Sequence, residues 1–251
     1  MVQDTQLIMG MPITITLSDV HATTDDLTTI FDYFQHIDEQ FSPYKETSEV
    51  SKINRHDIVP SSYSPEMQEV IHWCRKTQEE TFGFFNPWHN NVFDPSGVVK
   101  GWAIQRASDK LKEMGLPNHS VDAGGDIALS GHNEKNEDWH IGIKNPFKQD
   151  EIIKVLLLTD MGIATSGTYI RGQHIYNPYH PDDTITEIVS LTVLAQNVFE
   201  ADRFATPAFA MGRKGIEFIQ DKEGLEGYMI DSDGVATYSD GFKKYVLEET
   251  V

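Results

Sequence analysis

The stretch Asn118-His119-Ser120-Val121-Asp122-Ala123-Gly124-Gly125-Asp126-Ile127 lies where the chain changes character. Before it, apolar residues recur every three or four positions, a spacing that predicts amphipathic helices at 25–40, 64–83 and 98–114. After it, short β-like runs between Gly, Asn and Asp turns dominate, at 155–159, 188–194 and 228–230, with one helix near 201–212. Because helices and strands are segregated and do not alternate as βαβ units, the sequence predicts an α+β fold.

Local signals mark several of these elements. Within 7–17, Ile13, Ile15 and Leu17 alternate with polar residues, the period of a half-buried strand. Thr23 or Thr24 is the expected N-cap of the first helix, and Ser64 followed by proline opens the second. There is no internal repeat, low-complexity tract or Pro/Ser-rich linker, so we expect one domain over 1–251.

Composition limits the classes of partner. The chain has 251 residues, 39% of them hydrophobic, which is enough for an ordinary globular core. Its formal net charge of -19 disfavours nucleic acid and anionic membranes, because the long-range field repels phosphates. Short acidic runs are expected on solvated faces. A phosphate-bearing ligand would therefore need a local cation.

The single cysteine and the N-terminal residues indicate in which cellular compartment the protein is expected. A single cysteine, Cys74, excludes an intrachain disulfide and disfavours a cysteine-based zinc site. It is expected on the apolar face of a helix, packed in the protein core. The first residues lack the basic start and long apolar run of a signal peptide, and no run of about 18 apolar residues occurs. We expect a cytoplasmic protein without a membrane anchor.

Generic nucleotide-binding signatures are absent, and small glycine turns take their place. The sequence has neither a Gly-x-x-x-x-Gly-Lys-Ser/Thr loop nor a Gly-x-Gly-x-x-Gly after a strand. Glycine turns occur at 94–97, 122–126 and 165–168, where backbone groups could approach a ligand or simply form ordinary turns. Lys100 falls in the first turn of a predicted helix, where a cation favours an anionic partner nearby. A solvated lysine is the alternative.

Two further positions suggest chemistry. Asp202 and Thr206 stand four residues apart and would share one face of a helix, offering hard oxygen ligands to magnesium or calcium. The alternative is that Asp202 caps a helix that begins there, which would also place Pro207 at a tolerated early position. His174 lies between polar turns and could transfer a proton, although it is one of 10 histidines and could equally be a surface residue.

Taken in order, these segments resemble the ApbE family of flavin transferases, which move FMN from FAD onto a threonine of a target protein. Gly124-Gly125-Asp126-Ile127 matches a family turn outright, and Ser48-Glu49-Val50-Ser51-Lys52-Ile53-Asn54 is similar to its Ser-Glu-Leu-Ser-x-Leu-Asn segment. The other similar segments are Met9 to Pro12, Phe41 to Tyr44, Gly83 to Pro87, Asp94 to Ala103, Ala164 to Gly167, His174 to Pro178, and Ala201 to Thr206, the last resembling Ala-Asp-Ala-x-x-Thr. The resemblance implies a single ApbE-like domain of mixed helices and mainly antiparallel strands.

The resemblance also implies a site. Residues expected to contact FAD are Met9, Tyr44, Phe84, Phe85, Asn86, Asp94, Lys100 and Ile175. Magnesium would be held by Asp202, Thr206 and the carbonyl of Gly97, and would neutralise pyrophosphate charge during phosphoryl transfer. His174 would take the proton from the acceptor threonine while AMP leaves. The partners implied are FAD and an acceptor protein.

Three departures affect the expected activity. Asn86, Thr168 and Asn177 each stand where the family pattern has aspartate, so three carboxylates are missing from the expected site. Neutral amides and hydroxyls attract a divalent cation less strongly. The leading hypothesis is a magnesium-dependent FAD:protein FMN transferase, with FAD pyrophosphatase activity when no acceptor is present. A weakened FAD-binding protein acting as carrier or sensor is the alternative, and a flavin-free acidic docking protein is the third.

Overall fold

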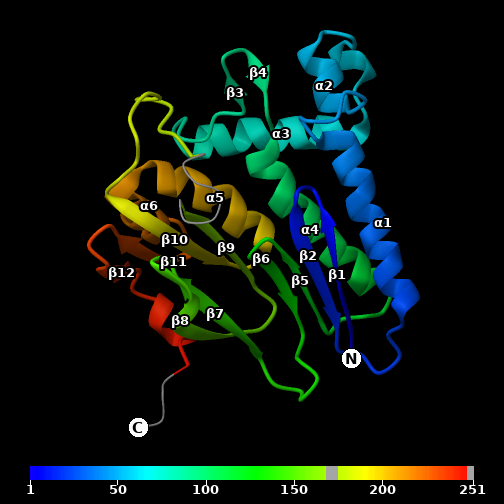
Figure 1. The fold of residues 1–251 in the computed structure, drawn as a ribbon, viewed down its shortest axis with the longest axis vertical. Coiled ribbons are helices and arrows are strands. Elements are labelled where there is room, and N and C mark those ends of the chain that lie inside the picture. The colour runs from blue at the N-terminus through cyan, green and yellow to red at the C-terminus, as the bar shows by residue number, and fades with distance from the viewer. Residues whose placement is uncertain (168–174, 248–251) are drawn as a thin grey trace.

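A computed structural model describes residues 1–167 and 175–247, and it contains one large antiparallel sheet with helices on one face (Figure 1). Eight strands pair in the order β1-β2-β5-β6-β9-β10-β11-β12, and every pairing is antiparallel among the described residues. Their bounds are Val2–Ile8, Met11–Leu17, His119–Ala123, Asp126–Ser130, Gly162–Gly167, Ile188–Ala195, Glu226–Asp231 and Ala236–Tyr238. Two separate hairpins join β3 (Trp88–His89) to β4 (Val92–Phe93), and β7 (Trp139–Asn145) to β8 (Lys148–Leu158). The α+β expectation with mainly antiparallel strands is confirmed.

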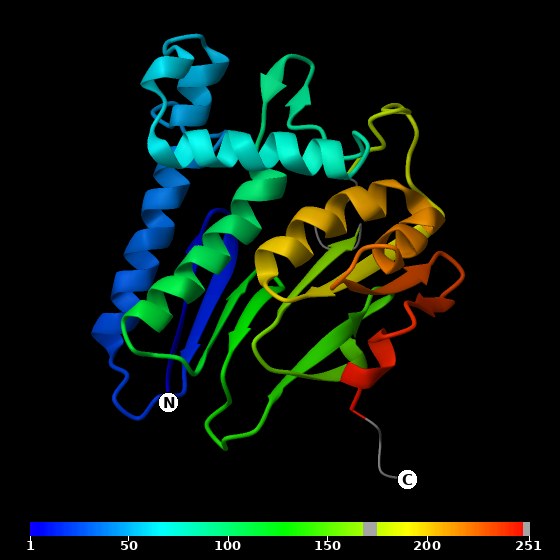
Figure 2. The same ribbon diagram turned by 180° about the vertical axis from the view of Figure 1, so that it is seen from behind.

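The helices cover the face of the sheet that Figure 2 turns toward the viewer. There α1, α4 and α5 lie across the sheet, with α4 between the other two, and α3 runs across their ends. The helical bounds are α1 Thr24–Phe41, α2 Glu49–Asn54, α3 Pro65–Glu80, α4 Ser96–Glu113, α5 Val198–Ala210 and α6 Gly215–Gln220. Short 3-10 turns occupy Pro60–Ser62, Gly212–Lys214 and Phe242–Tyr245. Within the described ranges, no helix has the length and apolar character needed to cross a membrane.

Local signals account for several element boundaries. The Thr23 hydroxyl accepts the Asp26 N–H while the Asp26 carboxylate accepts the Thr23 N–H, a capping box that starts α1. At the start of α3, the Ser64 hydroxyl accepts the Met67 N–H, and Pro65 occupies the first helical position. Ile13, Ile15 and Leu17 of β2 are fully buried, as their alternation predicted.

The strand alternation expected within 7–17 falls in β2, after a turn at Met9 and Gly10, which both have positive φ (55° and 71°). The possible helix cap at Asp202 was wrong. Helix α5 begins before Asp202, since the Asn197 side chain accepts the Glu200 N–H and caps it. Asp202 is therefore not a helix cap, and Pro207 lies inside the helix. Helix α2 was not expected from the sequence.

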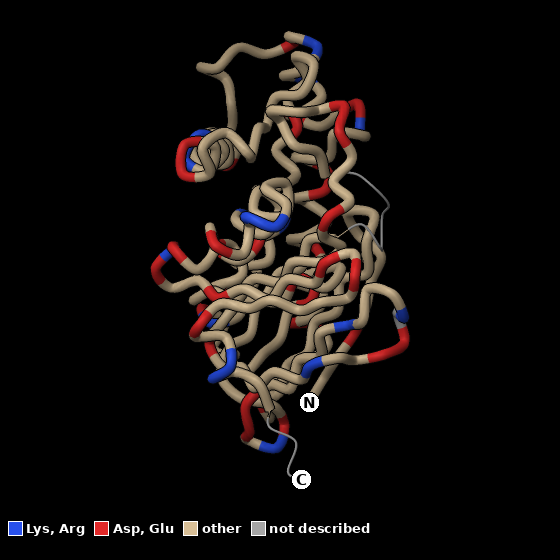
Figure 3. The backbone as a smooth tube through the Cα atoms, turned by 90° about the vertical axis from the view of Figure 1, so that its left-hand side faces the viewer, with Lys and Arg blue, Asp and Glu red and all other residues tan. Residues whose placement is uncertain are grey.

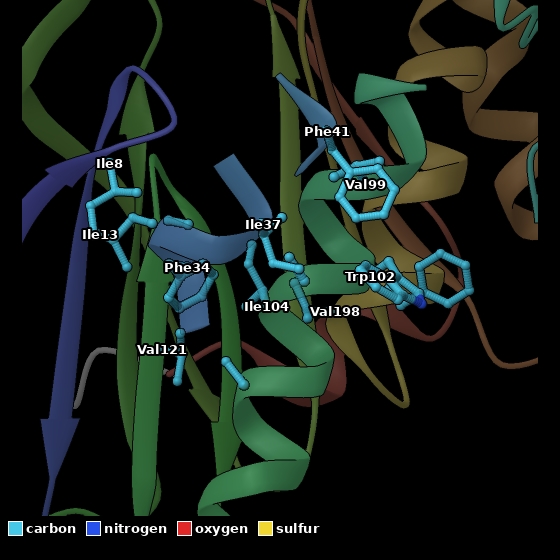
Figure 4. Close-up of a cluster of buried hydrophobic side chains, with 14 of the residues drawn as sticks. Ile8, Ile13, Phe34, Ile37, Phe41, Val99, Trp102, Ile104, Val121 and Val198 are labelled. Carbon is cyan, nitrogen blue, oxygen red and sulfur yellow. The ribbon is translucent and has the colours of Figure 1, made fainter. Parts of the chain in front are cut away.

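The core between the sheet and the helices is continuous and apolar. Figure 4 shows Ile13 and Val121 from the strands facing Phe34 and Ile37 of α1 and Ile104 of α4. Each of these five side chains is fully buried. Burying a side chain of this size contributes roughly 1.5–3 kcal/mol, so this contact fixes α4 against the sheet.

Cys74 belongs to the same core. Its side chain is buried on α3, and burial raises the pKa of its thiol to about 12. The thiol therefore stays protonated and unreactive near neutral pH. The expected structural role of Cys74 is confirmed.

Antiparallel pairing places two glycine turns at the same end of neighbouring strands in the sheet. The Met9–Gly10 turn and the Gly124–Gly125 turn lie side by side, because β2 and β5 pair and the Gly124 N–H donates to the Pro12 carbonyl at 3.0 Å. Strand β9 ends at Gly167 at the same end of the sheet. This end of the sheet lies beside the contact between α4 and α5.

Candidate functional site

A cluster of one lysine and two aspartates lies where α4, α5 and β6 meet. Lys100 Nζ pairs with the carboxylate of Asp126, the first residue of β6, and is 3.2 Å from Oδ1 of Asp202 on α5. Both aspartate side chains are almost completely buried, whereas Lys100 keeps 26% of its side chain exposed. The sequence left open a phosphate or carboxylate partner or a solvated lysine, and in the structure the partners of Lys100 are carboxylates.

A close approach of two helices makes this cluster possible. The Gly101 N–H donates to Oδ2 of Asp202 at 2.7 Å. A Cβ at Gly101 would lie 2.7 Å from the Asp202 Cβ, so only glycine allows α4 and α5 to come this close. The carboxylate of Asp202 is thus held by α4 on two sides, through a backbone donor and through Lys100.

The same geometry affects the Gly97 carbonyl. In a regular α-helix, the Gly101 N–H would be directed to the carbonyl of Gly97, four residues earlier. Because Asp202 also accepts this N–H, its carboxylate competes with the Gly97 carbonyl for the donor. The Gly97 carbonyl oxygen therefore retains capacity to accept another interaction.

Burial and mutual repulsion shape the protonation of the cluster. Burial raises the pKa of Asp202 above its ordinary value, an effect that Lys100 opposes and the nearby Asp126 carboxylate reinforces. Burial by itself would lower the pKa of Lys100, but the two carboxylates outweigh it and raise that pKa. Two acidic side chains share one cation here, so the cluster has unused affinity for positive charge.

Hydroxyl groups from β9 and α5 border the carboxylates. Thr206 Oγ1 is 3.3 Å from Ser166 Oγ, and the Thr165 N–H donates to Oδ1 of Asp126 at 3.0 Å. Asp202 and Thr206 stand one turn apart on α5, as expected from their spacing. Residues 165–167, where the sequence suggested a glycine turn, belong to strand β9 and pair with β10, so that expectation was wrong. The end of this strand supplies polar groups directly to the cluster.

The expected flavin-contact segment lies beside the start of α4. Phe85 is buried and packs on Gly97, where a Cβ would be 3.0 Å from the Phe85 ring. Phe84 is partly buried and packs with Ile175 in a second apolar cluster. The structure thus brings Phe84, Phe85, Gly97 and Ile175 into one region, beside Lys100 on the first turns of α4.

The two described departures from the aspartate pattern both use their amides in turns. Asn86 Oδ1 accepts the Trp88 N–H at 3.0 Å, and Asn177 Oδ1 accepts the Tyr179 N–H at 2.9 Å. An acceptor oxygen two residues before the donor is typical of Asx turns. An aspartate could form either bond, so the turns do not require asparagine.

Asp94 lies immediately before α4. Its Oδ1 accepts the Ser96 N–H at 3.0 Å at the start of α4. The pKa of the Tyr176 phenol is raised, chiefly by burial and further by the Asp94 charge. Asp94 therefore contributes negative charge between α4 and the segment that follows residue 174.

The other expected site residues stand apart or cannot be placed. Met9 is partly buried in the β1–β2 turn, and the Tyr44 ring is 93% exposed on the loop after α1. Neither is packed into the Lys100 cluster. His174 and Thr168 lie outside the described residues.

Comparison with known proteins agrees with the arrangement of these segments. A model of the ApbE family matches residues 9–94 and 89–229. The chain belongs to the ApbE family. The FAD:protein FMN transferase of Vibrio cholerae serotype O1 is 32% identical over 161 residues, covering 61% of this chain and 47% of that protein. That of Haemophilus influenzae is 31% identical over 170 residues, covering 62% and 49%. The chain spans about half the length of the curated relatives it matches.

Solved ApbE structures share the fold over nearly the whole chain. The flavin transferase ApbE from Vibrio cholerae aligns with a TM-score of 0.85 at 23% identity, covering 97% of this chain and 98% of that one. The ApbE protein from Thermotoga maritima also gives 0.85, at 22% identity and with 98% and 99% coverage. The ApbE fold expected from the motifs is confirmed.

Two residues of this site were not expected from the sequence. Asp126 lies in the quoted Gly-Gly-Asp-Ile match, yet only the structure reveals its pairing with Lys100. Arg203 lies within the quoted 201–206 segment, where the resembled pattern has alanine. The sequence signal for Asp126 was its place in the matching turn, and the signal for Arg203 was its departure from the alanine of the pattern.

The donor chemistry fits a hard divalent cation. Asp202 offers a carboxylate, Thr206 a hydroxyl and Gly97 a carbonyl, all oxygen ligands of the kind magnesium takes. Across residues 1–167 and 175–247, no group of three or more His, Cys, Asp or Glu is arranged to hold a metal. A cation here would therefore depend on hydroxyl and carbonyl oxygens as well as on carboxylate.

Proposed function

We propose that this chain is a magnesium-dependent FAD:protein FMN transferase, which moves FMN from FAD to a threonine of an acceptor protein. Its relatives in Vibrio cholerae and Haemophilus influenzae are named FAD:protein FMN transferase. The observation that carries the proposal is the buried cluster of Lys100, Asp126 and Asp202 at the start of α4, beside the Thr206 hydroxyl.

In the proposed reaction, the threonine hydroxyl oxygen attacks the phosphorus atom on the FMN side of the FAD pyrophosphate. A new phosphoester bond forms, the bond from that phosphorus to the bridging oxygen breaks, and AMP leaves. His174 accepts the hydroxyl proton, and AMP carries away the electron pair of the broken bond. Phosphoryl transfer of this kind depends mainly on positioning and electrostatic stabilisation.

The residues have distinct proposed roles. Lys100 supplies positive charge to the pyrophosphate, and it does so from the first turns of a helix whose N-terminus also favours anions. Asp202, Thr206 and the Gly97 carbonyl would hold the magnesium ion, which when bound would neutralise charge on the phosphate oxygens. Met9, Tyr44, Asp94 and the Phe84–Asn86 and Ile175 segments would contact FAD.

Water could replace the acceptor threonine, which would give FMN and AMP by slow hydrolysis. A second function has specific support: Asn86 and Asn177 present neutral amides where the family pattern has carboxylates. Fewer carboxylates weaken cation binding. The chain would then retain FAD as a carrier or sensor without efficient transfer.

Product analysis distinguishes these functions. Purified protein is incubated with FAD and Mg²⁺, with and without a threonine-containing acceptor peptide, and products are separated by HPLC and mass spectrometry. FMN-peptide and AMP are expected, and Asp202→Ala should reduce their formation at least about 100-fold, the loss typical of a key electrostatic group. Arg106→Met, a substitution on the exposed face of α4, is the control that should retain activity. Intact bound FAD would favour the carrier, and unbound FAD would contradict both.

A further inference from the structure

Arg203 is a buried charge beside the proposed metal-binding residue Asp202. Only 4% of its side chain is exposed, and the resembled family pattern places alanine at this position. A buried charge destabilises a protein unless it is paired and hydrogen-bonded. Its partners therefore show what the arginine holds together.

The partners of Arg203 connect α5 to the end of α3. Its Nη2 donates to Oε2 of Glu200 at 2.7 Å, and its Nη1 pairs with the carboxylate of Glu80, the last residue of α3. The guanidinium also lies 4.1 Å from the centroid of the Phe204 ring. Lys222 Nζ donates to the Glu80 carbonyl at 3.2 Å, so the end of α3 is held through both its side chain and its backbone.

The segment that follows Glu80 leads directly to the expected flavin contacts. The buried Thr81 hydroxyl donates to the Thr77 carbonyl at 2.7 Å and accepts the Phe85 N–H at 3.1 Å. This bond folds the chain back, so that Phe85 packs on Gly97 at the start of α4. The position of Phe85 is thus coupled to the position of Glu80.

The contacts close into a ring. From Gly97, helix α4 continues to Gly101, whose N–H donates to Asp202, the residue next to Arg203. One connection from α5 therefore runs through Asp202 to α4, and the other runs through Arg203 to the end of α3. Both meet where Phe85 contacts Gly97.

We propose that Arg203 is a positioning residue that fixes the 84–86 segment relative to Asp202 and the start of α4. The effect of this on flavin binding rests on the proposed function, in which that segment contacts FAD. Arg203 touches neither substrate nor cation in this role and acts through Glu80.

The test uses the full chain with Arg203→Met, Arg203→Lys, Glu80→Gln and the double variant Arg203→Met/Glu80→Gln. Hydrogen exchange by NMR compares the Phe85 amide, which bonds to Thr81, with the Gly101 amide, which bonds to Asp202. Flavin fluorescence gives the Kd for FAD. Arg106→Met is the matched control, because Arg106 also pairs with a glutamate of α3, namely Glu69, away from the 84–86 segment.

Arg203→Met should raise the FAD Kd and speed Phe85 exchange relative to Gly101, each about tenfold, within the coupling usual for residues in one network. Glu80→Gln should act in the same direction, the double variant should add little to it, and Arg203→Lys should lie between. Glu80 is 32% exposed, so its variant tests the same link even if Arg203→Met does not fold.

Equal acceleration at Phe85 and Gly101, an unchanged FAD Kd in a wild type that binds FAD, or the same effects from Arg106→Met would overturn the inference. If the wild type binds no FAD, the proposed function fails instead. The ratio of the two exchange rates still decides whether Arg203 positions the segment.

Discussion

The contact between α4 and α5 makes Gly101→Ala an informative substitution. In an ordinary helix interior, replacing glycine by alanine stabilises a protein by roughly 0.5–1 kcal/mol. Here the added Cβ would lie 2.7 Å from the Asp202 Cβ and 2.8 Å from its Oδ2, closer than real Cβ atoms come. Overpacking of this kind costs about 1–3 kcal/mol, so the clash outweighs the gain in helix propensity.

We therefore expect Gly101→Ala to lower the free energy of unfolding by about 1 kcal/mol, which for a chain of this size lowers Tm by roughly 2–4 °C. Urea and thermal denaturation measure the change, and AMP release from FAD should fall because Asp202 is displaced. In an Asp202→Gly background the clash is relieved, and Gly101→Ala should become neutral or stabilising. A Gly101→Ala protein more stable than wild type, with full activity, would refute this account of the helix contact.

Three other perturbations have defined outcomes. Lys100→Met leaves two buried carboxylates without their cation, so it should destabilise the chain by about 3–5 kcal/mol, and millimolar Mg²⁺ should raise its Tm more than that of wild type if the cluster binds a cation. Burial lowers the pKa of His119 from 6.5 to about 4, so the unfolded chain binds a proton that the folded chain resists, and stability falls as pH drops from 6.5 to 4. The effect is about 3 kcal/mol, and urea midpoints should fall less between pH 7 and 4.5 in His119→Gln than in wild type. Asn86→Asp with Asn177→Asp should increase Mg²⁺-dependent AMP release several-fold while keeping both turns, and an unchanged rate would show that the missing carboxylates do not limit activity.

The Lys100 cluster lies in a protein whose charged residues are mostly acidic. The chain carries 39 acidic and 20 basic residues, and in Figure 3 acidic positions recur along the whole molecule among fewer basic ones. FAD, the substrate proposed above, would therefore approach a surface of mostly the same charge sign as its pyrophosphate. The acidic composition indicated that a phosphate-bearing ligand would need a local cation. In the structure, Lys100 lies near the start of α4 and is such a cation.

The sequence by itself was sufficient wherever the determining interactions are local. The Thr23 and Ser64 caps lie within three residues of their partners, and the alternation of Ile13, Ile15 and Leu17 requires only a strand with one buried face. The order of the motifs was likewise enough to identify the family and hence the fold. Asp202 and Thr206 could be placed on one helical face because helix geometry depends only on spacing.

Tertiary structure decided what depends on contacts between distant segments. Lys100 meets Asp202 because Gly101 lets α5 approach α4, and it meets Asp126 because α4 packs beside β6. No spacing in the sequence encodes either approach. Helix α5 begins at Val198, because Asn197 caps it and its apolar residues pack on the sheet, so Pro207 is accommodated within the helix. The buried Arg203 is stable there because Glu80, more than a hundred residues away in the chain, is brought against it. Local patterns thus determined most of the elements, but not α2 or the start of α5, while desolvation and packing between elements determined the protonation and partners of the site.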